Sequence, residues 1–110
     1  LHVGRMGVEN RIVSNAISII VRRLEVHPKD ILLVVGPGIK KCCYNIDIAI
    51  MIKRQATSYY VPRRNIHLVD TCTCCGVEED DDGEYSFFSH RRSAETGEQE
   101  GRFLTAVSFK

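Results

Sequence analysis

The chain has 110 residues, of which 44% are hydrophobic and 26% are charged, and its formal net charge is +1. This composition is that of one small globular domain and excludes a disordered chain. The balanced charge predicts no attraction to nucleic acid or membrane surfaces, and no apolar run approaches the roughly 20 residues that span a bilayer.

The N-terminus has neither an initiator Met nor the features of a signal peptide, because the chain starts with Leu1-His2-Val3-Gly4. We therefore expect residues 1–110 to be a single partial domain from a longer protein. The five cysteines form an odd, closely spaced set, Cys42, Cys43, Cys72, Cys74 and Cys75. Such spacing is more typical of reduced thiols than of a disulfide framework, so we expect a cytoplasmic protein.

Helical periodicity in the first part of the chain predicts a helix over residues 8–24, which ends before His27-Pro28. The predicted inner face consists of Ile12, Ala16, Ile19 and Ile20, with Val13, Ile17 and Leu24 beside it. The continuous apolar run at 31–35 predicts a strand covered on both faces.

Gly36-Pro37-Gly38 ends that strand, and a second helix is predicted over 46–58 with Ile48, Ile52 and Gln55-Ala56 inward. Three further strands are predicted at 66–69, 85–89 and 103–109, with an acidic loop at 78–84. This order of elements predicts an α/β fold, a mixed sheet with layered helices.

A glycine-containing turn opens the chain at residues 2–7, between a predicted strand and the first helix. Backbone amides at such a turn favour an anion, and His2 could ligate a metal. The alternative is an ordinary strand-to-helix turn.

A second glycine-broken loop at residues 36–44 leads to the adjacent thiols Cys42 and Cys43. It could place Cys43 against a substrate, and Lys40 and Lys41 have the charge that favours a thiolate. The alternative is a pair of buried thiols that pack as alanine does.

The two-residue gap between Cys72 and Cys75 is that of a zinc knuckle. A structural site needs four ligands, and the second pair would have to be Cys42 and Cys43. Because adjacent cysteines chelate poorly in tetrahedral geometry, the sequence favours free thiols over zinc here.

The C-terminal part carries Phe87-Phe88-Ser89-His90-Arg91-Arg92, which predicts a buried strand that delivers polar groups at its exit. A hydroxyl, an imidazole and two guanidinium groups suit a site for an anion or a sugar. The alternative is a solvated strand edge.

Five segments in this order resemble the multicopper polyphenol oxidase, or laccase-domain, family, also described as purine nucleoside phosphorylase-like and as peptidoglycan editing factor. The family motifs are a His-Ala-Gly-Trp-Arg-Gly turn, a Gly-Pro-x-Ile-Gly-x-Cys-Cys-Tyr-Glu loop, Cys-Thr, Phe-Phe-Ser-Tyr-Arg-Arg and Thr-Gly-Arg. The corresponding segments here are residues 2–7, 36–45, 72–73, 87–92, and 96–97 with 101–102.

The resemblance implies a cysteine-hydrolase-like fold and a zinc enzyme that cleaves adenosine or inosine with phosphate and deaminates adenosine. Two His and one Cys hold the family's metal. His2 matches one of these His, and the other two ligands are expected upstream of this chain. Copper is less expected, since multicopper sites need more His than the four present.

By the same resemblance, Arg91 or Arg102 would neutralise phosphate, while Cys43 and Ser89 would contribute to the substrate pocket. The expected ligands are a purine nucleoside and phosphate. Departures from the motifs count against activity: Arg5 and Met6 replace Trp and Arg, Lys40 replaces Gly, Asn45 replaces Glu, and a stretch after Tyr44 is missing.

Two alternatives remain open. One is a peptidoglycan-precursor editing hydrolase of the same family. The other is a non-catalytic, degenerate copy that acts through protein contacts.

Overall fold

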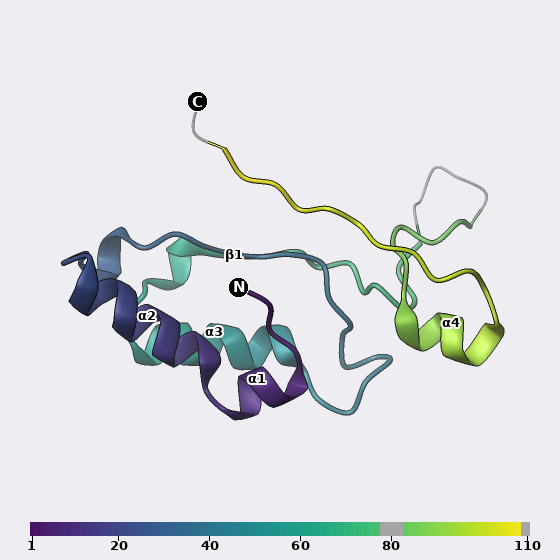
Figure 1. The fold of residues 1–110 in the computed structure, drawn as a ribbon, viewed down its shortest axis with the longest axis horizontal. Helices are drawn as coiled ribbons and strands as arrows, with labels where there is room; N and C mark the ends of the chain where they lie inside the picture. The colour runs from purple at the N-terminus through teal and green to yellow at the C-terminus, as the bar shows by residue number, and fades with distance from the viewer. Residues whose placement is uncertain (78–82, 109–110) are drawn as a thin grey trace.

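The computed structural model describes residues 1–77 and 83–108 (Figure 1). Its elements in chain order are α1 (Arg5–Glu9), α2 (Ile12–Arg23), a 3-10 turn (Pro28–Asp30), β1 (Leu33–Val35), α3 (Ile48–Ser58), a 3-10 turn (Arg63–Asn65), β2 (Ile66–Leu68) and α4 (His90–Thr96). Most of the predicted acidic loop, residues 78–82, lies outside the described residues.

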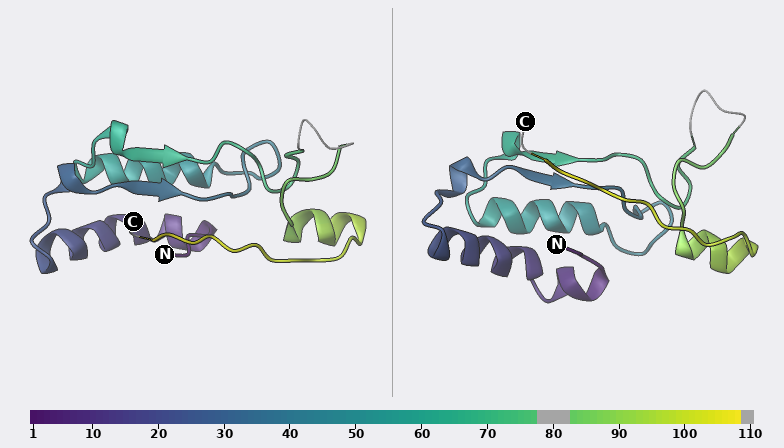
Figure 2. Two further views of the ribbon diagram at one scale, coloured as in Figure 1. Left: turned by 90° about the horizontal axis from the view of Figure 1, so that it is seen from above. Right: turned by 45° about the horizontal axis from the view of Figure 1, so that its top comes forward.

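The sheet of the described residues consists of β1 and β2, which are parallel and pair Leu33 with Ile66 and Val35 with Leu68. Helix α3 connects the two strands, as a parallel pair requires. Figures 1 and 2 show α1, α2 and α3 on the same side of the sheet. The predicted mixed α/β class is therefore confirmed, whereas the larger laccase-domain sheet is not seen in this part of the chain.

The hydrophobic core lies between the three N-terminal helices and the sheet. Its buried members are Val8, Val13, Ile17, Ile52, Ala56, Val61 and Ile66. The prediction that Ile52 and Ala56 of α3 face inward is confirmed.

The predicted inner face of the first helix is wrong in part. Ile12 packs against the core, but Val13 and Ile17 are its buried residues and Ile19 and Ile20 are exposed. The sequence was interpreted as one helix over 8–24. In the structure the helix is interrupted at Arg11, whose left-handed backbone (φ 59°) separates α1 from α2. The break lets Val8 of α1 and Val13 of α2 contribute to the same core.

A side chain of α3 joins the two helices at this break. Gln55 donates from Nε2 to the Val8 carbonyl at 2.6 Å and accepts from the Ser14 amide at 3.3 Å. The amide of a residue in the first turn of a helix has no partner within that helix. Gln55 therefore satisfies a helix terminus as well as linking three helices.

Strand β1 is covered on one face only, so the prediction of a strand buried on both faces is wrong. Val34 is 63% exposed, whereas Leu33 and Val35 pack against the core. The apolar run in the sequence does not distinguish the two faces, because every residue in it is hydrophobic.

The predicted strands at 85–89 and 103–109 are also wrong over the described residues. Near the first, a single antiparallel bridge joins Val77 to Tyr85, and residues 103–108 contain no strand. Ser89 instead begins helix α4, since its hydroxyl accepts from the Arg92 amide at 3.3 Å, and Gly97 ends that helix with a φ of 75°. A serine N-cap and a left-handed glycine are the usual boundaries of a short helix.

The molecule is elongated, with extents of 47 × 34 × 20 Å and a radius of gyration of 15.7 Å. A compact domain of this length would have a radius of gyration of about 13 Å. Helix α4 lies at the end opposite α2, and the segment after it runs back towards the sheet (Figures 1 and 2). No helix of the described residues is long and apolar enough to cross a membrane.

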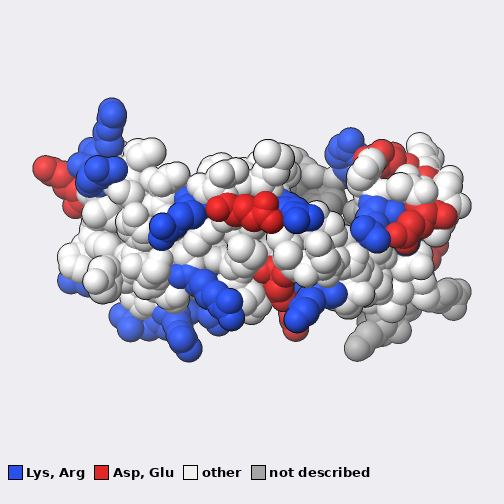
Figure 3. Space-filling view, turned by 90° about the horizontal axis from the view of Figure 1, so that it is seen from below, with Lys and Arg blue, Asp and Glu red and all other residues white. Residues whose placement is uncertain are grey.

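Basic and acidic side chains are interspersed over much of one long face of the molecule (Figure 3). The described residues also form local ion pairs, including Arg5 with Glu9 and Arg91 with Glu95.

Candidate functional site

The loops that follow β1 and β2 meet at one edge of the sheet, because the two strands are parallel and adjacent. Gly38 forms a parallel bridge with Cys72, and the Thr73 amide donates to the Gly38 carbonyl at 3.2 Å. The carboxyl ends of parallel strands are where α/β proteins place their ligand sites. The two loops that the sequence singled out are thus brought together.

Lys40 connects the two loops through both its backbone and its side chain. Its amide donates to Cys72 Sγ at 3.4 Å, and its Nζ donates to the Val69 carbonyl at 2.8 Å. The sequence analysis interpreted Lys40 only as a departure from the family motif and as a positive charge near the thiols. The structure adds a positioning role, with the side chain only 17% exposed.

Four thiols gather where these loops meet. The Sγ atoms of Cys42, Cys43, Cys72 and Cys75 all lie within 4.8 Å of one another, and the sulfurs of Cys42 and Cys75 are 3.4 Å apart. This cluster could hold a metal ion. The sequence-based preference against it rested on the adjacency of Cys42 and Cys43. A tight turn, closed by the Cys43 amide on the Lys40 carbonyl at 3.0 Å, places both sulfurs in the group.

The thiols differ in acidity. Burial alone would raise the pKa of Cys72, but donation from the amides of Lys40, Cys75 and Cys74 outweighs it and lowers that pKa to about 6. A hydrogen bond with Cys75, with burial second, raises the pKa of Cys43. Cys72 is the one buried member of the group, and the amides around it favour its charged form.

A hollow of about 700 Å³ opens beside the thiol cluster. It is lined by Arg5, Lys41, Cys42, Cys43, Tyr44, Asn45, Cys74, Arg91 and Glu95. We call it the cationic pocket, because three of these residues are basic and one is acidic. It brings together Cys43 and Arg91, two predicted substrate-binding residues that are distant in the sequence.

Arg91 lies in the first turn of α4, and its guanidinium is 3.0 Å from Glu95, one turn later. Both side chains are about half exposed, so this ion pair is weak and open to exchange. An anion entering the pocket could therefore recruit Arg91 at little cost.

The remaining predicted site residues lie outside the cationic pocket. Ser89 is buried and serves as the N-cap of α4. Arg102 donates to Glu100 at 2.8 Å, which lowers the pKa of that carboxyl. His2 is exposed and makes no hydrogen bond within residues 1–77 and 83–108.

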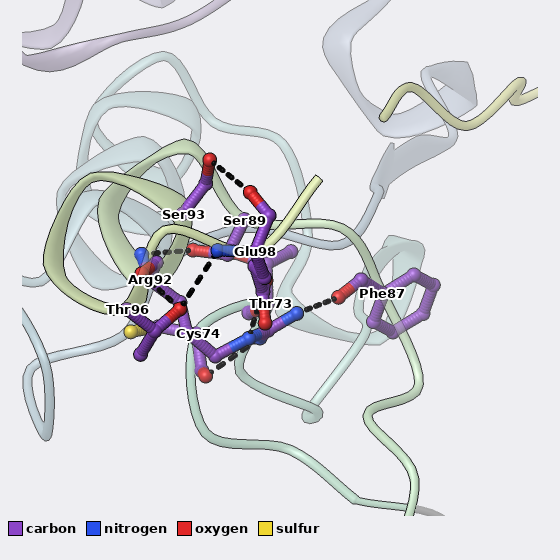
Figure 4. Close-up of polar contacts among 8 residues, drawn as sticks. All are labelled: Thr73, Cys74, Phe87, Ser89, Arg92, Ser93, Thr96 and Glu98. Atoms are coloured by element: carbon purple, nitrogen blue, oxygen red, sulfur yellow. Dashed lines mark hydrogen bonds and ion pairs between the residues drawn. The ribbon is translucent and has the colours of Figure 1, made fainter. Parts of the chain in front are cut away.

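Arg92 was missed as a key residue by the sequence reasoning. It is only 6% exposed and donates to the carbonyls of Thr73, Cys74 and Phe87 at 2.8–3.0 Å (Figure 4). Its Nε also meets Glu98 at 2.7 Å. A signal in the sequence was its place three residues after a serine, the spacing of a helix N-cap.

Arg92 also lines a second hollow of about 440 Å³, which we call the aromatic pocket. Its other lining residues are Tyr85, Ser86, Phe87, Phe88, Glu98, Gln99 and Phe103. The guanidinium lies 3.7 Å from the centre of the Tyr85 ring, within cation–π range. Neighbouring arginines of α4 thus border two different pockets.

Comparison with known families gives a match to the multi-copper polyphenol oxidoreductase laccase family over residues 1–51. This confirms the family that the sequence motifs predicted, over the part of the chain that contains α1, α2, β1 and the adjacent thiols Cys42 and Cys43. No curated protein and no solved structure gives a significant match to the chain.

Proposed function

We propose that this chain belongs to a cytoplasmic, zinc-dependent purine nucleoside phosphorylase with adenosine deaminase activity, and that it supplies the phosphate-binding part. The observation that carries the proposal is the cationic pocket, in which Arg91 of α4 and the Cys43–Tyr44 loop line one hollow. The family match over residues 1–51 supports the enzyme class, and five free thiols are in keeping with a reducing compartment.

In this proposal, the guanidinium of Arg91 holds phosphate by paired N–H donation, the geometry that this fork favours. Arg5, at the start of α1 and paired with Glu9, and Lys41, in the loop after β1, add positive charge to the lining. Glu95 loses its partner when Arg91 turns to phosphate and, being exposed, is then solvated by water. Charge built up on phosphate or sugar during phosphorolysis would be offset by the same groups.

The zinc that the family implies would polarise the substrate or activate water when bound. Catalytic zinc needs three protein ligands, and the motif match assigns only His2 within this chain. His2 is exposed and has an imidazole available for a metal, but it cannot hold a catalytic zinc alone. We therefore assign the pocket's own residues to binding and charge neutralisation only.

Phosphate binding by the chain tests the proposal, with Arg91→Gln and Arg102→Gln as a matched pair. We expect isothermal titration with inorganic phosphate to show weaker binding for Arg91→Gln by about tenfold, the loss of one charge-assisted pair. Arg102→Gln should bind as wild type, because Arg102 lies outside the pocket. Equal loss in both variants, or none in either, would remove the cationic pocket as the phosphate site.

A second candidate is a non-catalytic copy acting through protein contacts, and the replacement of a Gly of the family's Cys-Cys-Tyr loop by Lys40 favours it. The replacement of the family's Trp-Arg by Arg5-Met6 points the same way, since Met6 is exposed and carries no charge. This candidate predicts no phosphate binding and no nucleoside cleavage. The titration above therefore separates it from the first.

A further inference from the structure

We propose that Cys42, Cys43, Cys72 and Cys75 bind a structural zinc ion as a closed tetrathiolate site. This site differs from the catalytic zinc that the family resemblance implies, because it uses four thiols of this chain and no histidine. It does not depend on the proposed enzymatic function.

The geometry fits a tetrahedral ion with little rearrangement. Zn–S bonds of about 2.3 Å place the sulfurs of a tetrahedral site about 3.8 Å apart. Here the four Sγ atoms lie within 4.8 Å of one another, and those of Cys42 and Cys75 are 3.4 Å apart. Shifts of less than an ångström in side-chain position would complete the site.

The surroundings of the cluster support thiolate ligands. The Lys40 amide already donates to Cys72 Sγ at 3.4 Å, and such donors to a ligand sulfur are the usual support of a metal site. A zinc ion with four thiolates carries a net negative charge, and Lys41, next to Cys42 in the chain, is a basic neighbour on the same hollow.

Hydrogen bonds from Arg92 hold the backbone of the turn that contains Cys72 and Cys75. Arg92 donates to the carbonyls of Thr73 and Cys74, the two residues between these ligands, at 3.0 and 2.8 Å. Cys74 itself is buried and is not part of the four-sulfur group. The chain therefore contains a matched control cysteine within the same turn.

A disulfide is the competing use of these sulfurs, since Cys42 and Cys75 are close. A bond would need about 2.05 Å between sulfurs and would leave two partners of the cluster without a role. All five cysteines are free in the structure. A metal uses all four sulfurs at once, which is why we favour it.

The bound zinc would join the loop after β1 to the loop after β2. Cys42 and Cys43 also line the cationic pocket, so the same ion would fix one wall of that pocket. The zinc site would thus have a structural role beside the proposed phosphate site.

Metal analysis of the chain purified under reducing conditions, without added chelator, tests this proposal. We expect near-stoichiometric zinc, and cobalt substitution should give the thiolate charge-transfer and tetrahedral ligand-field bands of a four-sulfur site. Cys42→Ser and Cys75→Ser change exposed side chains, so the fold should survive. Each variant should bind zinc at least about 100-fold more weakly, since even the loss of a supporting residue costs 10- to 100-fold.

The control is Cys74→Ala, which should retain zinc and the cobalt spectrum of the wild type. The proposal is overturned if the reduced wild-type chain takes up no zinc, or if Cys74→Ala loses it as fully as Cys42→Ser. Isolation of the chain with these thiols paired as disulfides and metal-free would also overturn it. Failure here leaves phosphate binding by Arg91 untouched, so the two proposals are tested separately.

Discussion

Two adjacent arginines of α4 have opposite roles. Arg91 is half exposed, paired with Glu95, and faces the cationic pocket. Arg92 is buried and donates to the carbonyls of Thr73, Cys74 and Phe87. It thereby links the turn after β2 to the segment before α4. The helix turns about 100° per residue, which places one guanidinium at the cationic pocket and the next against buried backbone carbonyls.

Arg92→Ala should destabilise the protein by about 3 kcal/mol, because it leaves buried carbonyls and the Glu98 carboxylate without a partner. Urea denaturation followed by circular dichroism measures this loss. Arg91→Ala is the control and should cost less than about 0.5 kcal/mol, as is usual for an exposed ion pair. Equal losses in the two variants would contradict the structural role of Arg92.

At the scale of elements, the exposure of β1 can be tested with two neighbouring valines. Val35→Thr places a hydroxyl against the core and should cost about 1–2 kcal/mol. Val34→Thr changes an exposed position to another β-branched residue and should cost less than about 0.5 kcal/mol. Both are measured by urea denaturation, and similar costs would mean that both faces of the strand are covered.

The sequence predicted the elements whose hydrophobic pattern is contained in one continuous segment. The positions of α3, β1 and β2 agree with the expected ranges to within about two residues. The break at Arg11 was not predictable from periodicity, because a left-handed arginine has no distinctive neighbour in the sequence. The strands expected at 85–89 and 103–109 failed because a strand needs a pairing partner, which hydrophobicity alone does not reveal.

Of the candidate site, the sequence identified Cys43 and Arg91 but not their meeting in one hollow. It also named the four cysteines of the cluster, but it disfavoured a zinc site because Cys42 and Cys43 are adjacent in the chain. Only the tertiary pairing of β1 with β2 shows that the two loops lie together. Lys40 and Arg92 were missed as positioning residues, since a single basic residue gives no signal of burial.

At the scale of the whole molecule, the central feature is that the loops after β1 and β2 lie together at one edge of the sheet. One helical body, α1 to α3, packs on the two-stranded sheet, and the thiol cluster and both pockets lie beyond the carboxyl ends of the strands. The family match over residues 1–51 includes the first of these loops. The loop after β1 and helix α4 together line the cationic pocket.

The most direct measurement is purine release from inosine or adenosine by the full gene product that carries this chain, loaded with zinc and assayed with and without phosphate. We expect release of the free base with ribose 1-phosphate only when phosphate is present. Arg91→Gln should lower this rate, whereas Arg102→Gln should not. Equal release without phosphate, or no release by the zinc-loaded protein, would contradict the proposed phosphorolysis.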